Sequence, residues 1–400
     1  MKLKRLFLIG IFIAVIVLVY WLFSRNGPDR EFSRGRFFVE GGALMMSDEL
    51  GSNIPEFKIK GIVYSPYYPG ETGGEDLPND GRYEDHLKKA KSVGANTLSL
   101  FPQKMPAEFF QTLEREDLFY AQIINLTLYD GTDNSDLLNE EYQQKTKEHL
   151  FSIIDHNYSV GSPERLIYFA LGYELNPGII LNTNHLHPNE TSFSGRFIKL
   201  ENRQPAEIAL AKLLDSAMIY EAQTYNRLSL YTHISFSAYE AVNFKADFFD
   251  ILAFNIYPSY YYAPRSQFNS GFPDYLSKNL SLASKPFIIT ELGLPSVLES
   301  GVINGVPPYG NNSEEDVANF YHRVTSDIAL VQGLSGLFVF EFMDEHWKNG
   351  EEENDAFSHN PEDQEEWFGL YRVEEDEAGR LYLAPKELII EAVRELLNSF

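Results

Sequence analysis

Short apolar segments alternate with longer helix-like segments from about residue 57 to the C-terminus. The apolar segments are rich in β-branched and aromatic residues, which is typical of strands buried on both faces of a parallel sheet. The pattern predicts eight strands, at Ile59–Tyr64, Asn96–Phe101, Tyr120–Leu126, Leu166–Leu171, Leu228–Ile234, Ile251–Ile256, Phe287–Thr290 and Gly336–Phe340.

Helices are predicted between these strands, and the one after the fifth strand, at Ala238–Asn243, is weak. An α/β chain with eight such units, and with candidate chemistry at the carboxyl ends of its strands, favours a (β/α)8 TIM barrel over an open doubly wound sheet. We expect this barrel to span residues 57–400. The other predicted helices are Tyr83–Val93, Ala107–Glu114, Glu140–His156, Ala206–Tyr225, Phe272–Ala283, Glu314–Val331 and Lys386–Leu397.

The N-terminus has the pattern of a membrane anchor. A basic segment, Met1–Arg5, precedes 18 apolar residues without a charge, Leu6–Phe23, and about this length is the minimum for a transmembrane helix. No small-residue cleavage site follows. We therefore expect residues 1–24 to form an uncleaved signal anchor in the cell membrane, with the catalytic domain extracytoplasmic and residues 25–56 as a stalk or linker. A cleaved signal peptide is the alternative, and either interpretation exports the protein.

Composition excludes several functions. The net charge of −25 argues against a nucleic-acid partner. The absence of cysteine excludes disulfides, thiol catalysis and Cys-ligated metals. No glycine-rich phosphate-binding motif follows a strand, so we expect no nucleotide cofactor. His185 and His187 resemble a metal-binding pair, but they lie after the fourth strand rather than on the first, so we expect no metal or other cofactor.

Two glutamates carry the main functional prediction. Glu174 follows the fourth predicted strand, and Glu291 follows the run Phe287–Thr290 at the end of the seventh. In a barrel, the carboxyl ends of the strands open onto one active face. A pair of carboxylates at that face is the apparatus of glycoside hydrolysis. For a single such glutamate, a surface or ion-paired role is equally plausible, but both together favour catalysis.

Three further motifs resemble one family. The segment Phe254–Pro258 is similar to an Asn-x-Tyr-Pro motif, and Ile289–Ser296 is similar to a Glu-Thr-Gly-Trp-Pro-Ser motif. Phe338–Lys348, followed by Trp367–Leu370, resembles an eighth strand with a trailing Phe-Gly-Leu. Together they resemble glycoside hydrolase family 17 of clan A, the retaining β-1,3-glucanases and their transglycosidase relatives, over residues 57–400.

The resemblance implies that Glu291 is the nucleophile and Glu174 the acid/base of a double displacement. It also has departures. The family has Asn before the acid/base, where this chain has Tyr173, and Trp in the nucleophile motif, where this chain has Leu294. A different β-glycan is therefore a possible substrate.

Other residues near the strand ends are candidates for binding sugar, although each is also consistent with simple packing. Tyr257 is expected to position the carboxylate of Glu291. Tyrosines after the first strand suit sugar stacking, and an acidic and aromatic cluster follows the eighth. The long loops Asn176–Pro205 and Asn349–Glu366 are expected to shape the site. The candidate substrate-binding residues are Tyr64, Tyr67, Tyr173, Asn255, Tyr257, Glu345 and Trp347.

The sequence therefore predicts a membrane-anchored β-glycosidase or transglycosylase acting on an oligo- or polysaccharide of the β-glucan type. Two alternatives remain open. One is a non-catalytic carbohydrate-binding or scaffold protein on a degenerate barrel, which the loss of the family Asn at position 173 would favour. The other is a metal-dependent hydrolase that uses the His185–His187 pair.

Overall fold

The computed structural model describes residues 32–47, 53–71, 77–126, 135–236, 239–257, 272–274, 276–277, 280, 284–297, 311–346, 348 and 363–400. The predicted anchor at Leu6–Phe23 and the candidate sugar platform Trp347 lie outside these residues. Within the described residues, no helix is both long and apolar enough to cross a bilayer.

Eight parallel strands form a closed barrel, which confirms the predicted (β/α)8 core. Neighbouring strands follow chain order, and the last strand pairs with the first, with Gly336 opposite Ile59. The register shifts where Phe254 and Asn255 meet the seventh strand, beside the candidate nucleophile. The barrel strands are β5 (Ile59–Tyr64), β6 (Thr97–Leu100), β7 (Phe119–Ile124), β8 (Leu166–Tyr173), β12 (Leu230–Ser235), β13 (Leu252–Asn255), β14 (Phe287–Leu292) and β15 (Leu334–Val339).

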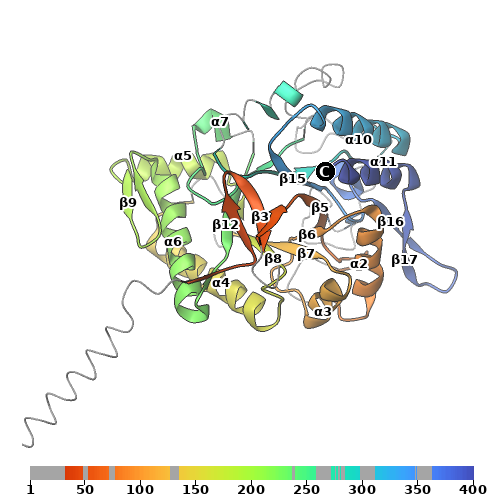
Figure 1. Ribbon diagram of the computed structural model, residues 1–400, viewed down its shortest axis with the longest axis horizontal. Helices are drawn as coiled ribbons and strands as arrows, with labels where there is room; N and C mark the ends of the chain where they lie inside the picture. The colour runs from red at the N-terminus through yellow and green to blue at the C-terminus, as the bar shows by residue number, and fades with distance from the viewer. Residues whose placement is uncertain are drawn as a thin grey trace, which may run out of the picture.

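Helices surround the barrel, as Figure 1 shows. Their ends follow local capping chemistry: Asn139 accepts the amides of Glu141 and Tyr142, and Ser313 and Asp316 form a capping box. The predicted helix Phe272–Ala283 falls partly outside the described residues. The described helices are α2 (Arg82–Val93), α3 (Ala107–Arg115), α4 (Glu140–Ser159), α5 (Pro177–Leu186), α6 (Pro205–Tyr225), α7 (Tyr239–Val242), α10 (Glu314–Ile328) and α11 (Glu387–Asn398).

The segment expected to be a stalk instead contributes a small sheet. Strands β2 (Phe37–Glu40), β3 (Ala43–Ser47) and β4 (Asn53–Glu56) pair antiparallel and lie over the barrel in Figure 1. The Phe37 ring meets that of Phe119, the first residue of β7, at 5.2 Å. The sheet therefore covers the amino end of the barrel. Buried apolar side chains along this segment, such as Phe37, outweigh its glycines and charges.

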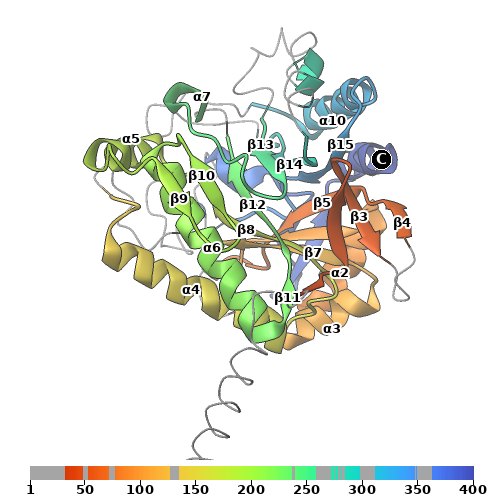
Figure 2. The ribbon, with the colours of Figure 1, turned by 60° about the vertical axis from the view of Figure 1, so that its left-hand side comes forward.

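Smaller elements also occupy the predicted loops. Strand β1 (Ser33–Arg34) runs parallel to β11 (Arg227–Leu228), just before β12. The long loop after β8 contains α5 and a hairpin of β9 (Ser192–Ser194) and β10 (Lys199–Glu201), which lies beside α6 in Figure 2. A second hairpin, β16 (Tyr371–Glu375) with β17 (Leu381–Pro385), precedes α11.

Buried side chains form two layers. One cluster fills the barrel, and it includes Val63, Ile123, Tyr168, Ile234 and Phe338. A larger cluster lies between the barrel and the helices. Because successive side chains of a strand point to opposite faces, each barrel strand contributes to both layers. This rigid double core fixes the carboxyl ends of β8 and β14, where the two predicted catalytic glutamates lie.

Candidate active site

Glu174 lies where β8 ends and the chain turns toward α5. Its backbone is left-handed, with a φ of 43°, which is uncommon for a residue with a side chain. The Glu174 amide donates to the carbonyl of Ile234 on the neighbouring strand at 3.0 Å. Backbone strain of this kind costs roughly 1–3 kcal/mol and concentrates at functional sites. The side chain remains partly exposed at the carboxyl end of the barrel.

A chain of hydrogen bonds joins Glu174 to the strand that carries Glu291. Asn255 Nδ2 donates to Glu174 Oε1 at 2.8 Å, and Thr290 Oγ1 donates to Asn255 Oδ1 at 2.8 Å. Asn255 also pairs with Glu291 in the register of β13 and β14. The structure thus brings the two predicted glutamates together. Asn255, which we expected to contact substrate, uses its amide to hold Glu174.

Glu291 is 6% exposed. Tyr257 donates its hydroxyl to Glu291 Oε2 at 2.7 Å, as the sequence predicts for a positioning tyrosine. The other carboxylate oxygen, Oε1, has no hydrogen-bond partner among the described residues. The Tyr257 ring packs edge-on against Phe340 and Phe368, which fixes its direction.

The two carboxylates share an environment that favours protonation. Burial, and then the negative charge of Glu174, raises the pKa of Glu291 to about 8, against the opposing effect of the Tyr257 hydrogen bond. Burial also raises the pKa of Glu174, against the hydrogen bond from Asn255. Like charges at a shared site titrate as a pair. Both carboxyls therefore hold a proton more readily than a freely exposed glutamic acid does.

A second buried charge cluster lies after β15. Lys348 Nζ contacts Glu341 Oε1 at 3.1 Å and Glu345 Oε2 at 2.6 Å, and it lies 4.5 Å from the centre of the Phe340 ring. Burial raises the pKa of Glu341 well above its ordinary value. The remaining oxygen of Glu345, Oε1, has no partner within the described part of the chain. Glu345, a predicted sugar ligand, is therefore a buried member of this cluster, with 2% of its surface exposed.

Glu365 is a candidate site residue that the sequence did not identify. It lies in the 3-10 helix η1 (Gln364–Trp367), in a segment anchored across the ends of β14 and β15. The amide of Glu345 donates to the Glu366 carbonyl, and that of Ser296 to the Trp367 carbonyl, each at 3.0 Å. Burial, and then the charge of Glu174, raises the pKa of Glu365 to about 7. The acidic residues of this segment gave no signal that Asp363 and Glu366 are buried and that Glu365 is partly buried close to Glu174.

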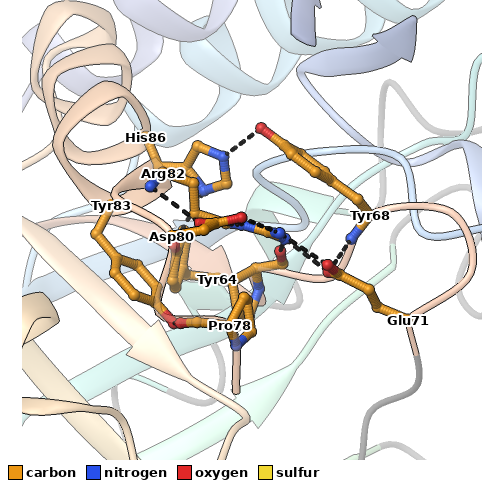
Figure 3. Close-up of polar contacts among 9 residues, drawn as sticks. Tyr64, Tyr68, Glu71, Pro78, Asp80, Arg82, Tyr83 and His86 are labelled. Atoms are coloured by element: carbon orange, nitrogen blue, oxygen red, sulfur yellow. Dashed lines mark hydrogen bonds and ion pairs between the residues drawn. The ribbon is translucent and has the colours of Figure 1, made fainter. Parts of the chain in front are cut away.

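Tyr67 is held near the site by a clamp in the loop after β5, drawn in Figure 3. Arg82 forms two hydrogen bonds to Glu71, at 2.6 and 2.7 Å, and stacks 4.2 Å from the centre of the Tyr68 ring. This arrangement fixes the turn that follows Tyr67, which is 3% exposed. Burial, and then the charge of Glu345, raises the pKa of Tyr67. Tyr67 therefore lies within electrostatic reach of the cluster after β15.

The remaining predicted residues are placed differently. Tyr64 is fully buried between the barrel and its helices, where its hydroxyl bonds to His86 Nδ1 at 3.0 Å and its ring stacks on Phe109. We leave it out of the proposed site. Tyr173 is partly exposed, and the charges of Glu291 and Glu174 add to burial in raising its pKa.

Two other features of the described part of the chain bear on the choice of site, namely its possible metal ligands and a pocket away from the glutamates. No group of three or more His, Asp or Glu among the described residues is arranged to hold a metal ion. His187, part of the alternative metal pair, instead contacts Asp136 at 2.9 Å. A pocket of about 900 Å³ lies at the opposite end of the barrel, lined by residues that include Gly41, Asp250, Lys285 and Gly333.

Solved structures with a similar fold include glycosidases. A β-galacturonidase from Eisenbergiella tayi, bound to galacturonate, matches with a TM-score of 0.58, 15% identity and coverage of 92% of this chain and 54% of that one. A Bifidobacterium dentium β-glucuronidase, complexed with coumarin-3-O-glucuronide, has a TM-score of 0.57 and 14% identity, and the match covers 90% of this chain and 48% of that chain. Saccharomyces cerevisiae Gas2p, in complex with laminaritetraose and laminaripentaose, has a TM-score of 0.51 and 13% identity, with 91% of this chain and 67% of that one covered.

No protein-family profile and no curated protein matches the sequence. The chain spans about half the length of the two uronidases. At these identities the comparisons show the fold: this chain has the TIM-barrel fold of known glycoside hydrolases.

Proposed function

We propose that the protein is a retaining β-glycosidase or transglycosylase that acts on a β-glucan-type polysaccharide. The observation that carries the proposal is the convergence of Glu174 and Glu291 at the carboxyl end of the barrel, where Asn255 links Glu174 to Thr290, the residue before Glu291. The structural likeness to glycoside hydrolases supports it at the level of fold, and the family 17 motifs support the specific reaction.

In the proposed reaction, Glu291 attacks the anomeric carbon while Glu174 donates its proton to the departing glycosidic oxygen. Glu174 then takes a proton from water or from a sugar hydroxyl. The oxygen of that water or hydroxyl attacks the anomeric carbon, breaks its bond to Glu291 and restores the enzyme. The nucleophile must be ionised and the acid protonated. The Tyr257 hydrogen bond supports the ionised form of Glu291. Burial raises the pKa of Glu174, and the proposal assigns the proton to this residue when substrate binds.

Sugar binding is assigned to residues around this pair. Tyr173, which is partly exposed, is proposed to line a subsite. Tyr67 and Glu345 are 3% and 2% exposed, so they are proposed to support the wall of the subsites from behind. Trp347, outside the described residues, remains a proposed stacking platform because it belongs to the segment that follows the eighth strand.

The charges at this end of the barrel favour an uncharged glycan over a uronate. A substrate carboxylate needs a cation, but Lys348 is already engaged by Glu341 and Glu345. Glu365 adds a further negative charge close to Glu174. The sequence adds eight acidic residues and no Lys or Arg between positions 349 and 366. We therefore favour a neutral β-glucan, although two of the structural relatives are uronidases.

We further propose that Leu6–Phe23 anchors the protein in the cell membrane with the barrel outside the cytoplasm. This rests on the apolar length of the segment and its basic flank.

The test begins with β-1,3-, β-1,4- and mixed-linkage oligosaccharides, of which at least one should be cleaved or redistributed in chain length. Glu291→Ala should abolish turnover. Glu174→Ala should spare substrates whose leaving group needs no proton, and added azide should give a β-glycosyl azide. A β-azide product from Glu291→Ala would reverse the two roles. Tight binding without turnover on every glycan would support the non-catalytic alternative.

A further inference from the structure

His233 and Tyr239 form a buried hydrogen-bonded relay around the backbone of Glu174. His233 lies on β12 with 1% of its surface exposed, and Tyr239 begins α7 with 3% exposed. His233 Nδ1 contacts the carbonyl of Leu171 at 2.8 Å, and Nε2 contacts the Tyr239 hydroxyl at 3.0 Å. The Tyr239 oxygen in turn accepts the amide of Leu175 at 2.6 Å. The relay thus begins before Glu174 and ends directly after it.

With a neutral His233, the partners in this relay determine the directions of its hydrogen bonds. The carbonyl of Leu171 can only accept, so His233 Nδ1 carries the hydrogen. The amide of Leu175 can only donate, so the Tyr239 oxygen accepts it and gives its own proton to Nε2. This pattern requires a neutral imidazole, and burial lowers the pKa of His233 to about 4. Donors and acceptors are then matched along the whole relay.

The bracketed backbone needs this support because two of its residues are left-handed. Between the two ends of the relay, Gly172 has a φ of 73° and Glu174 a φ of 43°. A side chain at Gly172 would come within 2.5 Å of Leu126, so the chain passes closely packed neighbours here. Since the Glu174 conformation is intrinsically unfavourable, the bonds at Leu171 and Leu175 help to keep it in place.

Aromatic packing makes the relay rigid. The His233 and Tyr239 rings are nearly parallel, at 7° and 5.8 Å between centroids. Phe244 and Phe249 complete the surroundings of His233 at 6.0 and 6.1 Å. A hydrogen bond in such an apolar environment is expensive to break, because the freed groups find no replacement partner.

We propose that His233 and Tyr239 are positioning residues that aim the carboxylate of Glu174 at the departing glycosidic oxygen. This inference rests on the proposed role of Glu174 as acid/base. Neither residue touches the reacting atoms. Their effect passes through the backbone at Leu171 and Leu175, so losing the relay should impair proton donation more than attack by Glu291.

The test is Tyr239→Phe, which keeps the ring and removes the hydroxyl. The kcat/KM is measured on two β-glycosides of a sugar that the enzyme cleaves, one with a dinitrophenyl leaving group and one with a phenyl leaving group. The kcat/KM for the phenyl substrate should fall roughly 10- to 100-fold, as expected for a misplaced catalytic group. The dinitrophenyl substrate, which departs without a proton, should change by less than about threefold.

Two controls separate the possible outcomes. Tyr120→Phe removes another buried hydroxyl, bonded to Asn157 at 3.0 Å, and should leave the ratio between the two substrates unchanged. Glu174→Ala gives the pattern expected for complete loss of the acid. The positioning role is overturned if Tyr239→Phe lowers kcat/KM equally for both substrates, or for neither, while Glu174→Ala lowers it mainly for the phenyl substrate. Equal losses in Glu174→Ala itself would overturn the acid/base assignment, and with it the positioning role.

Discussion

Tyr257 influences how Glu291 and Glu174 share their protons. Its hydroxyl donates to Glu291 Oε2 at 2.7 Å and lowers the pKa of a carboxyl that burial otherwise raises. Removing that donor in Tyr257→Phe should raise the pKa of Glu291, so the acid limb of the kcat/KM profile should move to higher pH. One hydrogen bond to a charged group is worth about 1.5–3 kcal/mol, so kcat/KM should fall roughly 10- to 100-fold.

The measurement is kcat/KM against pH for both enzymes. Tyr168→Phe provides a control, because that hydroxyl is buried in the barrel without a hydrogen-bond partner among the described residues. An acid limb that stays in place, or moves to lower pH, in Tyr257→Phe would contradict the proposed support of the ionised nucleophile.

Glu365 offers a second test, on specificity. Its pKa is raised to about 7 by burial and then by the charge of Glu174, so it becomes negative as the pH rises through that value. Discrimination against a β-glucan oxidised to uronate at C6, relative to the parent glucan, should therefore increase between about pH 6 and 8. Glu365→Gln should remove this rise and relax discrimination roughly five- to tenfold, the size of one screened charge interaction.

Glu391→Gln is the matched control, since it removes the same charge from an exposed position on α11. Relative rates on the two glycans report the effect. A Glu365→Gln enzyme that still rejects the uronate with unchanged pH dependence would show that Glu365 does not face the substrate.

A site residue could be predicted where the sequence immediately around it has a recognisable pattern. Glu174 and Glu291 were found because each is a carboxylate that directly follows an apolar strand. Glu365 lies in an irregular segment of uniform acidity, and neither helix nor strand periodicity predicts its direction. His233 was not predicted because a polar residue inside an apolar strand has no distinct pattern. Its partner Tyr239 lies beyond the strand, in a helix with a weak signal.

Among the elements, α11 is tied to the strand ends by a buried ion pair. Lys386, just before the helix, places Nζ 2.7 Å from Asp344 Oδ1 and 2.8 Å from Ser296 Oγ. The two charged side chains are 1% and 0% exposed. Lys386→Met should therefore destabilise the protein by about 1.5–3 kcal/mol at neutral pH, because the buried Asp344 loses its charged hydrogen-bond donor and must take up a proton instead.

The stability that Lys386→Met loses should depend on pH. Burial raises the pKa of Asp344 to about 6 although Lys386 opposes this, and the unfolded value is about 3.9. A raised pKa in the folded state means that stability falls as the pH rises between these values. Without Lys386 the folded pKa rises further, so the deficit of Lys386→Met should shrink at pH 5. Denaturant unfolding at pH 5 and at neutral pH measures the loss of stability. The control Lys88→Met, on the surface of α2, should have little effect on stability at either pH. An equal deficit at both pH values would contradict this account.

Among the secondary-structure elements, the barrel strands were predictable because strands that are buried on both faces have continuous apolar sequences. The sheet of β2, β3 and β4 was not, since its strands bury only part of one face and are mixed with glycine and charge. The hairpin of β16 and β17 gave no signal for the same reason. Most of its side chains are only partly buried or exposed, and the hairpin depends on tertiary contact with the segment after β15.

At the scale of the whole molecule, the N-terminal segment and the candidate active site lie at opposite ends of the barrel. The chain enters at the amino end, where β1 pairs with β11 and the small sheet covers the barrel. The glutamates lie at the other end. Residues 24–31 connect the predicted anchor to the first described residue, and eight residues reach at most about 29 Å. A barrel strand of six residues adds about 20 Å. An anchored protein should therefore hold its amino end near the bilayer and turn its active site away from it.

The absence of cysteine allows this orientation to be measured with single labels. Glu40→Cys marks the exposed turn of the small sheet, and Lys104→Cys marks an exposed position after β6, at the end that carries the glutamates. With the full chain in vesicles that contain an acceptor lipid, energy transfer should be stronger from the label at position 40. Equal transfer, or stronger transfer from position 104, would contradict the orientation. Failure of the full chain to associate with vesicles would instead contradict the anchor. An outward-facing site suits a glycan that is larger than the gap between barrel and membrane, because only the open side can admit a long chain.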